Sequence, residues 1–291
     1  ARQKLFHVRE QRPRPGRDDK ILTSWNGLMI KGMAIASRHL DKPELAESAQ
    51  QALDFIYSTL WRNGRLLATY KDGRAHLNAY LDDYVFLIDG ILELLQCRWR
   101  QQDIQFAIQL ADTVIEHFED KRNRGFYFTA DDHEKLIQRP KPMGDESIPS
   151  GNGIAAFALG RLGHLIGEHR YLNTVKQTLK ACWETMIAAP YANCSLLSAL
   201  EEYLEPPQLI ILRGTSEELS QWQSYCSNAY VPNRLVFAIP TEVQDLPGIL
   251  QQKNALAVRI CAFVCNGTQC LPIVYDEQEF KQLLKIDCIT P

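Results

Sequence analysis

The fold of this chain is indicated first by residues 18–26, which read DDKILTSWN, and by the segment that follows them. Residues 27–40 read GLMIKGMAIASRHL, which is apolar on nearly every side when drawn as a helix. Such a helix has to be covered all round by other elements, because its apolar surface would otherwise face water. A polar cluster at the start of a buried helix is also a place where a functional site is expected.

Two further pairs of helices follow, and each pair has the same two kinds of member. Residues 79–96 and 152–166 are nearly all apolar, like residues 24–40. Each of these apolar helices is followed by a helix with one apolar stripe, a pattern typical of a helix that faces water on one side. These striped segments are 43–60, 102–119 and 170–187, and a last helix is predicted at 194–204. The alternation predicts an inner and an outer ring, and therefore an α/α toroid built from helical hairpins.

Short β-like runs are expected between the hairpins, because turn residues such as Asn63-Gly64 and Lys71-Asp72-Gly73 flank apolar runs there. The predicted runs are 66–70, 126–129 and 136–138. Each lies shortly before an inner helix. We therefore expect these hairpins to decorate the rim of the toroid at the N-terminal ends of the inner helices.

The pattern changes after Pro206-Pro207, where the period of the apolar residues becomes that of strands. Strands are predicted at 209–212, 235–239 and 257–264, with helices near 216–227 and 276–286. The predicted fold is thus mainly α. Residues 1–205 form a partial toroid with short β-hairpin insertions, and residues 206–291 form a small α/β subdomain with partly parallel pairing.

Composition excludes several classes of function. The 291 residues carry a net charge of −3, which gives no reason to propose nucleic acid or an anionic membrane as partner. No apolar run reaches the length of about 18 residues that a membrane span needs. The eight cysteines lack a Cys-x-x-Cys motif and mostly lie in apolar runs, so a reduced, cytoplasmic protein is predicted. We find no Walker loop, nucleophile elbow or His-Glu-x-x-His motif, and we predict no cofactor and no metal.

Three rim segments are candidates for chemistry, since acids and aromatic residues gather where each inner helix begins. Hydrolysis or epimerisation of a sugar needs acid and base groups in one pocket, and aromatic faces can stack on a sugar ring. The residues predicted as catalytic are Asp19, Asp82, Asp83, Asp145 and Glu146. The residues predicted to contact a sugar-like substrate are Asp18, Lys20, Trp25, Asn26, Tyr80, Tyr84, Tyr127, Ser150 and Asn152.

A structural explanation competes with this one. Acids and hydroxyls at the start of a helix serve as N-caps, and the helix dipole favours acids there. Lys20 and Arg139 either bind an anionic group or pair with those acids. Cys265 and Cys270 flank an Asn-Gly turn, which predicts a hairpin with buried thiols, with a redox pair or metal site as the alternative.

Residues 18–30 resemble a characteristic stretch of the thioredoxin-domain-containing proteins related to spermatogenesis-associated protein 20. Residues 80–84, 125–128 and 149–152 match further stretches of that family in the same order, and residues 264–272 resemble its ending. The resemblance implies an N-terminal thioredoxin-like domain, followed by a six-hairpin (α/α)6 toroid of the glycosidase and N-acylglucosamine 2-epimerase type. The helices predicted here are too few to close such a ring. We therefore expect a C-terminal portion whose missing segments act in cis or as a separate chain.

Three functions follow from these patterns. The first is a carbohydrate-active toroid, hydrolase or epimerase, that uses the rim acids. The second is a non-catalytic binding or scaffold module that acts with a thioredoxin-like domain, the rim polar groups being caps and contacts. A zinc-dependent toroid of the lanthionine-cyclase kind is disfavoured, because the rim segments contain no cysteine.

Overall fold

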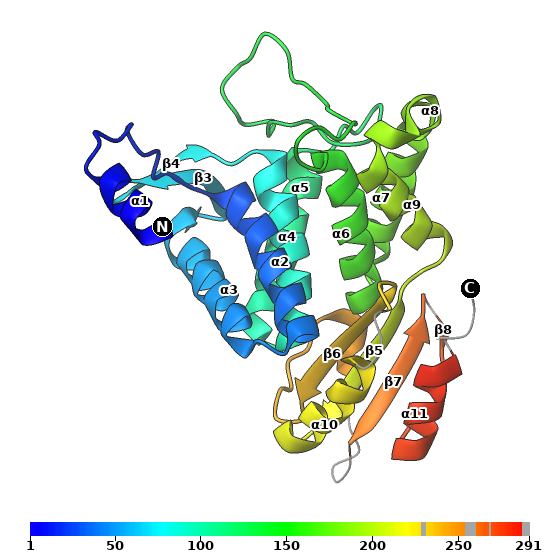
Figure 1. Cartoon of the computed structure of the whole chain (residues 1–291). Helices are drawn as coiled ribbons and strands as arrows, with labels where there is room; N and C mark the ends of the chain where they lie inside the picture. The colour runs from blue at the N-terminus through cyan, green and yellow to red at the C-terminus, as the bar shows by residue number, and fades with distance from the viewer. Residues whose placement is uncertain (228–230, 254–259, 268, 287–291) are drawn as a thin grey trace.

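The computed structural model describes residues 1–291 except 228–230, 254–259, 268 and 287–291. Its larger part consists of helical hairpins whose inner helices run side by side (Figure 1). The inner helices are α2 (Thr23–Leu40), α4 (Leu81–Cys97) and α6 (Gly151–Ile166). Each packs against an outer helix that follows it, namely α3 (Pro43–Phe55), α5 (Gln101–His117) and α7 (His169–Ala181). This alternation confirms the predicted partial α/α toroid.

Helix α4 is covered as its sequence predicts, and helix α2 is not. Nearly every residue of α4 is buried, because α2 and α6 flank it and α5 lies behind it. In α2 the side chains of Trp25 and Met29 are 63% and 60% exposed. The expectation that α2 is covered on every side is therefore wrong for this chain. The reason is that, in the part of the chain that the structure describes, α2 has a neighbouring inner helix on one side only.

The rim carries a small antiparallel sheet beside the start of α2 and α4. Strand β3 (Arg65–Lys71) pairs with β1 (Ile21–Leu22), β2 (Trp61–Arg62) and β4 (Arg74–Asn78). Since β1 leads directly into α2 and β4 precedes α4, the sheet lies at the N-terminal ends of both inner helices. The predicted hairpin before the second inner helix is confirmed.

The second predicted hairpin, at 126–129 and 136–138, is wrong. Phe126 makes an isolated bridge to Glu119, and residues 134–136 and 138 have no regular structure. The Phe128 amide donates to the carbonyl of Pro140 at 2.9 Å. Pro140 lies beyond the predicted run and has no amide hydrogen, so this contact cannot continue as a strand ladder, and residues 136–138 form no strand. This segment forms the long loop at the top of Figure 1, next to the N-terminal ends of the inner helices.

The chain continues through α8 (Trp183–Ala188), a 3-10 turn at Pro190–Ala192, and α9 (Cys194–Leu204), which packs on α6. A four-stranded sheet follows, in the order β6-β5-β7-β8. Its strands are β5 (Gln208–Gly214), β6 (Arg234–Pro240), β7 (Cys261–Asn266) and β8 (Gln269–Cys270). β5 is parallel to β6 and antiparallel to β7, so the partly parallel pairing is confirmed. Residues 257–259 of the predicted third strand lie outside the described residues.

Helices α10 (Ser216–Ser227) and α11 (Glu277–Ile286) pack together beside this sheet, where Trp222 stacks on Phe280 with ring centroids 4.6 Å apart. The predicted division at residues 205 and 206 falls between α9 and β5. The sheet nevertheless shares a core with the toroid, since Trp99 meets Phe237 edge to face at 6.1 Å. The α/β part therefore lies at the C-terminal ends of the inner helices (Figure 1).

Cys265 and Cys270 form a disulfide. The expectation of two buried free thiols is therefore wrong at this hairpin. β7 and β8 are antiparallel, and their register places these two residues directly opposite each other. The described free cysteines are Cys97, Cys182, Cys194, Cys226 and Cys261.

Helix α1 (Arg2–Glu10) precedes the toroid and has no buried residue. Its apolar residues Leu5, Phe6 and Val8 are all more than half exposed. Within the described residues, no helix combines the length and the apolar character that a membrane crossing requires.

Candidate functional site

The first turn of α4 is tied to the first turn of α2 through Asp83. The Ser24 amide donates to Asp83 Oδ1 at 2.8 Å, and the Tyr80 amide donates to Oδ2 at 2.9 Å. Burial raises the pKa of Asp83 to about 6, although both hydrogen bonds favour the charged form. Asp83 therefore serves as a shared cap for two inner helices, and both of its oxygens are occupied.

Asp145 has the corresponding role at α6. Its carboxylate accepts hydrogen bonds from the amides of Ser150 and Ser195, each at 2.8 Å, and from the Ser195 hydroxyl. The Ser150 hydroxyl caps α6 by accepting from the Gly153 amide at 3.0 Å. These bonds join the start of α6 to the start of α9. Ser150 and Asp145, both predicted site residues, are thus engaged in helix capping.

Asn152 holds the long rim loop against α6. Its side-chain oxygen accepts from the Phe126 amide at 2.7 Å, and its nitrogen donates to the carbonyls of Phe126 and Pro142 at 3.0 and 2.8 Å. The side chain is fully buried. Three hydrogen bonds satisfy most of what an amide side chain can make. The position of the Asn152 side chain is therefore explained by the hydrogen bonds that hold the rim loop against α6.

Asp82 differs from the other rim acids. Its Oδ1 is buried and, within the described residues, has no hydrogen-bond partner. A side-chain carbon added to Gly151 would lie 2.3 Å from that oxygen, so Asp82 touches the first turn of α6. Burial, and secondarily the charge of Asp83, raises the pKa of Asp82 to about 6. Such a carboxyl keeps a proton close to neutral pH, which is the property of a general acid.

The remaining predicted acids are exposed. Lys20 pairs with Asp18 at 3.3 Å, and Lys71 pairs with Asp19 at 3.3 Å. Glu146 is exposed in the loop that leads to α6. The pairing of Lys20 with an acid is the structural alternative named above.

Trp25 points away from the core, and Asn26 turns back to donate to the Leu22 carbonyl at 2.8 Å. The three tyrosines lie in different surroundings. Tyr84 is fully buried, and its hydroxyl accepts from the Leu66 amide at 2.9 Å. Tyr80 stacks on Phe128 with centroids 4.8 Å apart.

Arg139, the second cation named in the sequence, lies over the ring of Tyr127 at 4.2 Å. One face each of Tyr80 and Tyr127 is therefore covered by a neighbour. Tyr84 belongs to the core. Asp82 contacts the first turn of α6, and Asp83 accepts a hydrogen bond from the first turn of α2. The structure therefore brings the starts of the three inner helices together.

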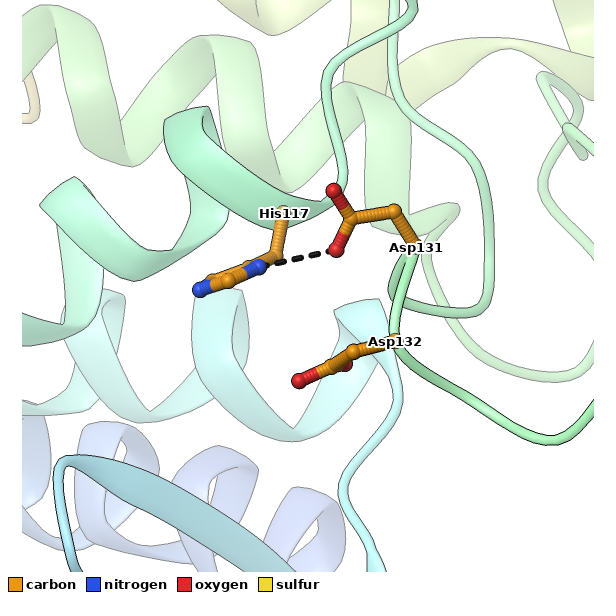
Figure 2. A group of neighbouring side chains, drawn as sticks. All are labelled: His117, Asp131 and Asp132. Carbon is orange, nitrogen blue, oxygen red and sulfur yellow. Dashed lines mark hydrogen bonds and ion pairs between the residues drawn. The ribbon is translucent and has the colours of Figure 1, made fainter.

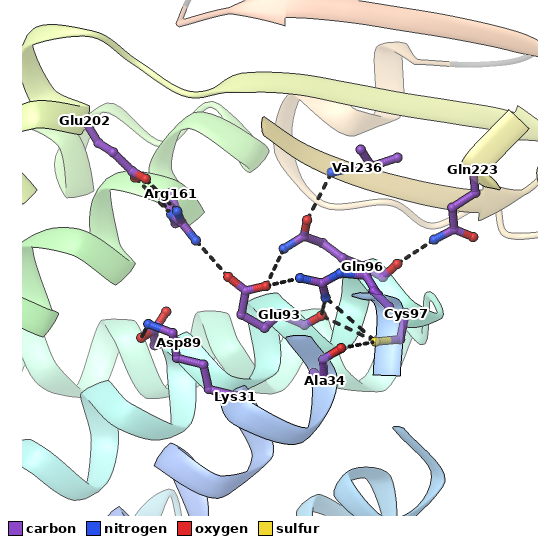
Figure 3. A network of polar contacts seen from close by, with 11 residues as sticks. Lys31, Ala34, Asp89, Glu93, Gln96, Cys97, Arg161, Glu202, Gln223 and Val236 are labelled. Atoms are coloured by element: carbon purple, nitrogen blue, oxygen red, sulfur yellow. Dashed lines mark hydrogen bonds and ion pairs between the residues drawn. The ribbon is translucent and has the colours of Figure 1, made fainter. Parts of the chain in front are cut away.

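A second polar cluster lies farther along the inner helices and was missed by the sequence analysis (Figure 3). Lys31 of α2 pairs with Asp89 of α4 at 2.7 Å, and Arg161 of α6 pairs with Glu93 of α4 at 2.9 Å. Arg161 also binds Glu202 of α9 through its Nε, at 2.9 Å. The signal was present in the sequence, as single ionisable residues inside helices that are otherwise apolar.

The charges of this cluster are balanced by partners from several helices. Burial alone would raise the pKa of Glu93, but the guanidinium groups of Arg38 and Arg161 hold it below the ordinary value. Burial raises the pKa of Asp89, and Lys31 only partly opposes that. The Val236 amide donates to the Gln96 side chain at 3.2 Å, which in turn donates to Glu93 at 3.0 Å. The cluster therefore ties the toroid to strand β6.

Figure 2 shows a third group, formed by His117, Asp131 and Asp132. Among the described residues their ligand-type atoms lie within 4.8 Å of one another, as the ligands of a metal ion do. The His117 ring bonds to Asp131 at 2.8 Å, while both oxygens of Asp132 accept from Arg65. Because a guanidinium already occupies Asp132, the arrangement is that of an ion-pair cluster.

Comparison with known proteins finds relatives that are similar to this chain over nearly its whole length. No protein-family model matches it. Human spermatogenesis-associated protein 20 is 27% identical over 300 residues, which cover 97% of this chain and 38% of the human protein. The mouse protein of the same name is 25% identical, with the same coverage of 97% and 38%. The chain is related to spermatogenesis-associated protein 20. It spans 38% of the length of these relatives, whose names state no reaction.

One solved structure supports the toroid fold. The GH76 α-mannanase of Bacteroides thetaiotaomicron matches with a TM-score of 0.51 at 14% identity, covering 64% of this chain and 53% of that chain. Cellobiose 2-epimerase from Spirochaeta thermophila matches with a TM-score of 0.46 at 13% identity, covering 56% and 43%. The first likeness shows the fold alone, part of a six-hairpin (α/α)6 toroid, and the second is too low to carry an argument. Shared fold does not establish shared chemistry.

Proposed function

We propose that the rim of this toroid is a carbohydrate-directed site, of a hydrolase or an epimerase, in which Asp82 donates a proton. The observation that carries the proposal is the buried Asp82 Oδ1 without a hydrogen-bond partner among the described residues. The pKa of Asp82, raised to about 6 by burial, keeps part of the carboxyl protonated near neutral pH. A protonated acid is one of the two groups that cleavage of a glycosidic bond requires.

The second carboxylate of the site is assigned by elimination. Asp83 and Asp145 have both oxygens engaged by capping hydrogen bonds. Asp19 is paired with Lys71. Glu146 remains, exposed in the loop next to α6. We assign it the role of base or nucleophile, which hydrolysis places about 5–9.5 Å from the acid.

The rest of the pocket wall is assigned to segments beyond this chain. The exposed face of α2, with Trp25 and Met29, is the place where a further inner helix of a toroid packs. The relatives carry more sequence than the part that this chain matches. We propose that additional helical hairpins close the ring there, and that a thioredoxin-like domain belongs to the same longer protein, as the resemblance implies.

The experiment compares two substitutions, Asp82→Asn and Glu217→Gln. A panel of mono- and oligosaccharides is screened by thermal shift, and the sugars that stabilise the protein are then tested for cleavage and epimerisation. We expect Asp82→Asn to keep the binding and lose the turnover, while Glu217→Gln, at an exposed acid of α10 away from the rim, keeps both. Turnover by the unmodified chain should fall as pH rises above about 6, as Asp82 loses its proton. Equal turnover by the unmodified chain and Asp82→Asn would refute the assignment.

A specific observation favours a second function, that of a non-catalytic scaffold. Asp83, Asp145, Ser150 and Asn152 all have structural hydrogen bonds that explain their positions. If no sugar in the panel stabilises the protein, and a purified longer relative shows no turnover, the scaffold is the function that remains.

A further inference from the structure

Of the two cysteines in the Cys265–Cys270 disulfide, one is exposed and the other is buried. Cys270 lies on the two-residue edge strand β8 and is exposed, whereas Cys265 on β7 is only 6% exposed. The two residues are five apart in sequence. A disulfide across so short a segment constrains the unfolded chain less than a long-range one does. Stabilisation is therefore a weak reason for this bond.

A lysine lies against both sulfur atoms. Lys253 Nζ is 3.1 Å from Cys270 Sγ and 3.6 Å from Cys265 Sγ, and it also lies 5.2 Å from the centre of the Phe263 ring. Burial lowers the pKa of Lys253. In the part of the chain that the structure describes, no carboxylate pairs with it. An ammonium beside a cysteine stabilises the thiolate, which is both the nucleophile and the leaving group of disulfide exchange.

A cavity opens beside the accessible cysteine. It has a volume of about 290 Å³, and its lining includes Cys270, Asn266, Gln269, Leu271 and Leu283. Side-chain amides can bind the backbone of a peptide, and the leucines offer it an apolar surface. The chemistry of the cavity suits a thiol carried on a peptide.

We propose that Cys265, Cys270 and Lys253 form a thiol–disulfide exchange site for a peptide-like thiol. The incoming thiolate attacks Cys270 Sγ, forms a mixed disulfide there, and expels Cys265 as a thiolate that Lys253 stabilises. A second substrate thiolate attacks the substrate sulfur of the mixed disulfide and releases the Cys270 thiolate beside the same ammonium. Two thiols are oxidised to one disulfide, and the protein disulfide takes up the two electrons and, at neutral pH, two protons.

The first test removes the buried partner. In Cys265→Ser, Cys270 cannot be resolved internally, so incubation with glutathione disulfide should give a mixed disulfide at Cys270, located by peptide mass spectrometry. The exposed Cys194 of the same molecule is the internal control. We expect Cys270 to react roughly threefold faster than Cys194 at pH 7, because the ammonium group of Lys253 raises the thiolate fraction of Cys270 while a stabilised thiolate is a somewhat weaker nucleophile. Adding Lys253→Met should remove that advantage, and equal rates with and without the lysine would overturn the proposal.

The second test needs no substitution. Reduced glutathione, or a small dithiol oxidoreductase, is added to the folded chain, and opening of the Cys265–Cys270 bond is followed by alkylation and mass spectrometry. Opening without denaturant is the expected result. Opening only in denaturant would show a structural cross-link and overturn the proposal. Faster reduction by glutathione identifies a small peptide thiol as the source, and faster reduction by the oxidoreductase identifies a protein dithiol.

Discussion

The close contact between α2 and α4 makes the sharpest prediction, because two glycines of α2 should respond in opposite ways to the same substitution. A side-chain carbon on Gly27 would lie 2.7 Å from the carbonyl carbon of Phe86 and 2.8 Å from the amide nitrogen of Leu87. Both atoms belong to the backbone of α4 and cannot rotate away. A carbon on Gly32 would have nothing within 4 Å.

The magnitude follows from these distances. Ordinary van der Waals contact begins at 3.4 Å, so Gly27→Ala forces the two helices apart by about 0.7 Å. Overpacking of this kind costs about 1–3 kcal/mol, and better helix propensity returns about 0.5–1 kcal/mol. We expect a net loss of about 1–2 kcal/mol in the free energy of unfolding for Gly27→Ala. For Gly32→Ala we expect a gain of about 0.5–1 kcal/mol.

Urea unfolding followed by circular dichroism measures both variants against the unmodified chain, with the slope m as a check that the same surface unfolds. The paired design removes the general effect of replacing glycine in a helix. If Gly27→Ala stabilises the chain as much as Gly32→Ala does, the backbones of α2 and α4 are not in close contact at Gly27.

Three further predictions concern the rim and the buried charges. Burial raises the folded pKa of Asp82 to about 6, above the value of about 3.9 for an unfolded aspartate, so this group destabilises the fold as pH rises from 4 to 6. At pH 7 the free energy of unfolding of Asp82→Asn, measured with urea, should therefore exceed that of the unmodified chain by about 1–2 kcal/mol. The difference should shrink toward pH 4. Arg161→Met leaves Glu93 and Glu202 without their shared cation and should cost about 3–5 kcal/mol in urea unfolding. Asn152→Ala removes three buried hydrogen bonds and should lower the free energy of unfolding by about 3 kcal/mol.

Each of these has an exposed counterpart as its control. Asp18→Asn should show little pH-dependent change. Arg170→Met breaks an exposed ion pair with Asp112 and should cost no more than about 1 kcal/mol. Asn78→Ala changes an exposed strand residue and should be nearly neutral. If the buried and exposed members of a pair change stability equally, the burial argument fails for that pair.

Much of the fold could be predicted, because helix burial leaves a direct trace in the spacing of apolar residues. The inner helices begin and end within a few residues of the predicted limits. The predicted helix at 43–60 also exists, although its last turn, Ile56–Leu60, is a π-helix. The hairpin predicted before α6 is wrong, because Phe128 bonds to Pro140, beyond the predicted run at 136–138, and Pro140 has no amide hydrogen with which to continue a ladder.

The disulfide shows a different limit. β7 and β8 pair in a register that places Asn266 opposite Gln269 and Cys265 opposite Cys270. The sequence predicts a hairpin here, but a two-residue Asn266-Gly267 turn would place Cys265 opposite residue 268, so the observed register does not follow from the sequence. The bond itself does not follow, because the same two residues are free thiols or a disulfide according to the redox surroundings.

The candidate site was harder to predict because a capping acid and a catalytic acid look alike in a sequence. Asp83 accepts a hydrogen bond from Ser24, which lies 59 residues earlier, and no local pattern predicts that pairing. Asp145 likewise accepts from Ser195, 50 residues later. Long-range packing decided which acids are occupied. The sequence limited the candidate site residues to the starts of three helices. It could not show which of the acids there are engaged in capping hydrogen bonds.

The structure separates these acids by a criterion that the sequence lacks, namely what each oxygen atom is bonded to. Asp83 and Asp145 are satisfied by backbone amides, and Asp19 is satisfied by a lysine. Of the five acids predicted as catalytic, Asp82 is the one with a buried oxygen left unbonded among the described residues. An unbonded buried carboxyl oxygen lowers stability, and helix capping does not require it, because Asp83 already caps α4. A substrate hydroxyl or ring oxygen that reaches Asp82 would supply the missing hydrogen bond, and for this reason we locate the proposed chemistry at Asp82.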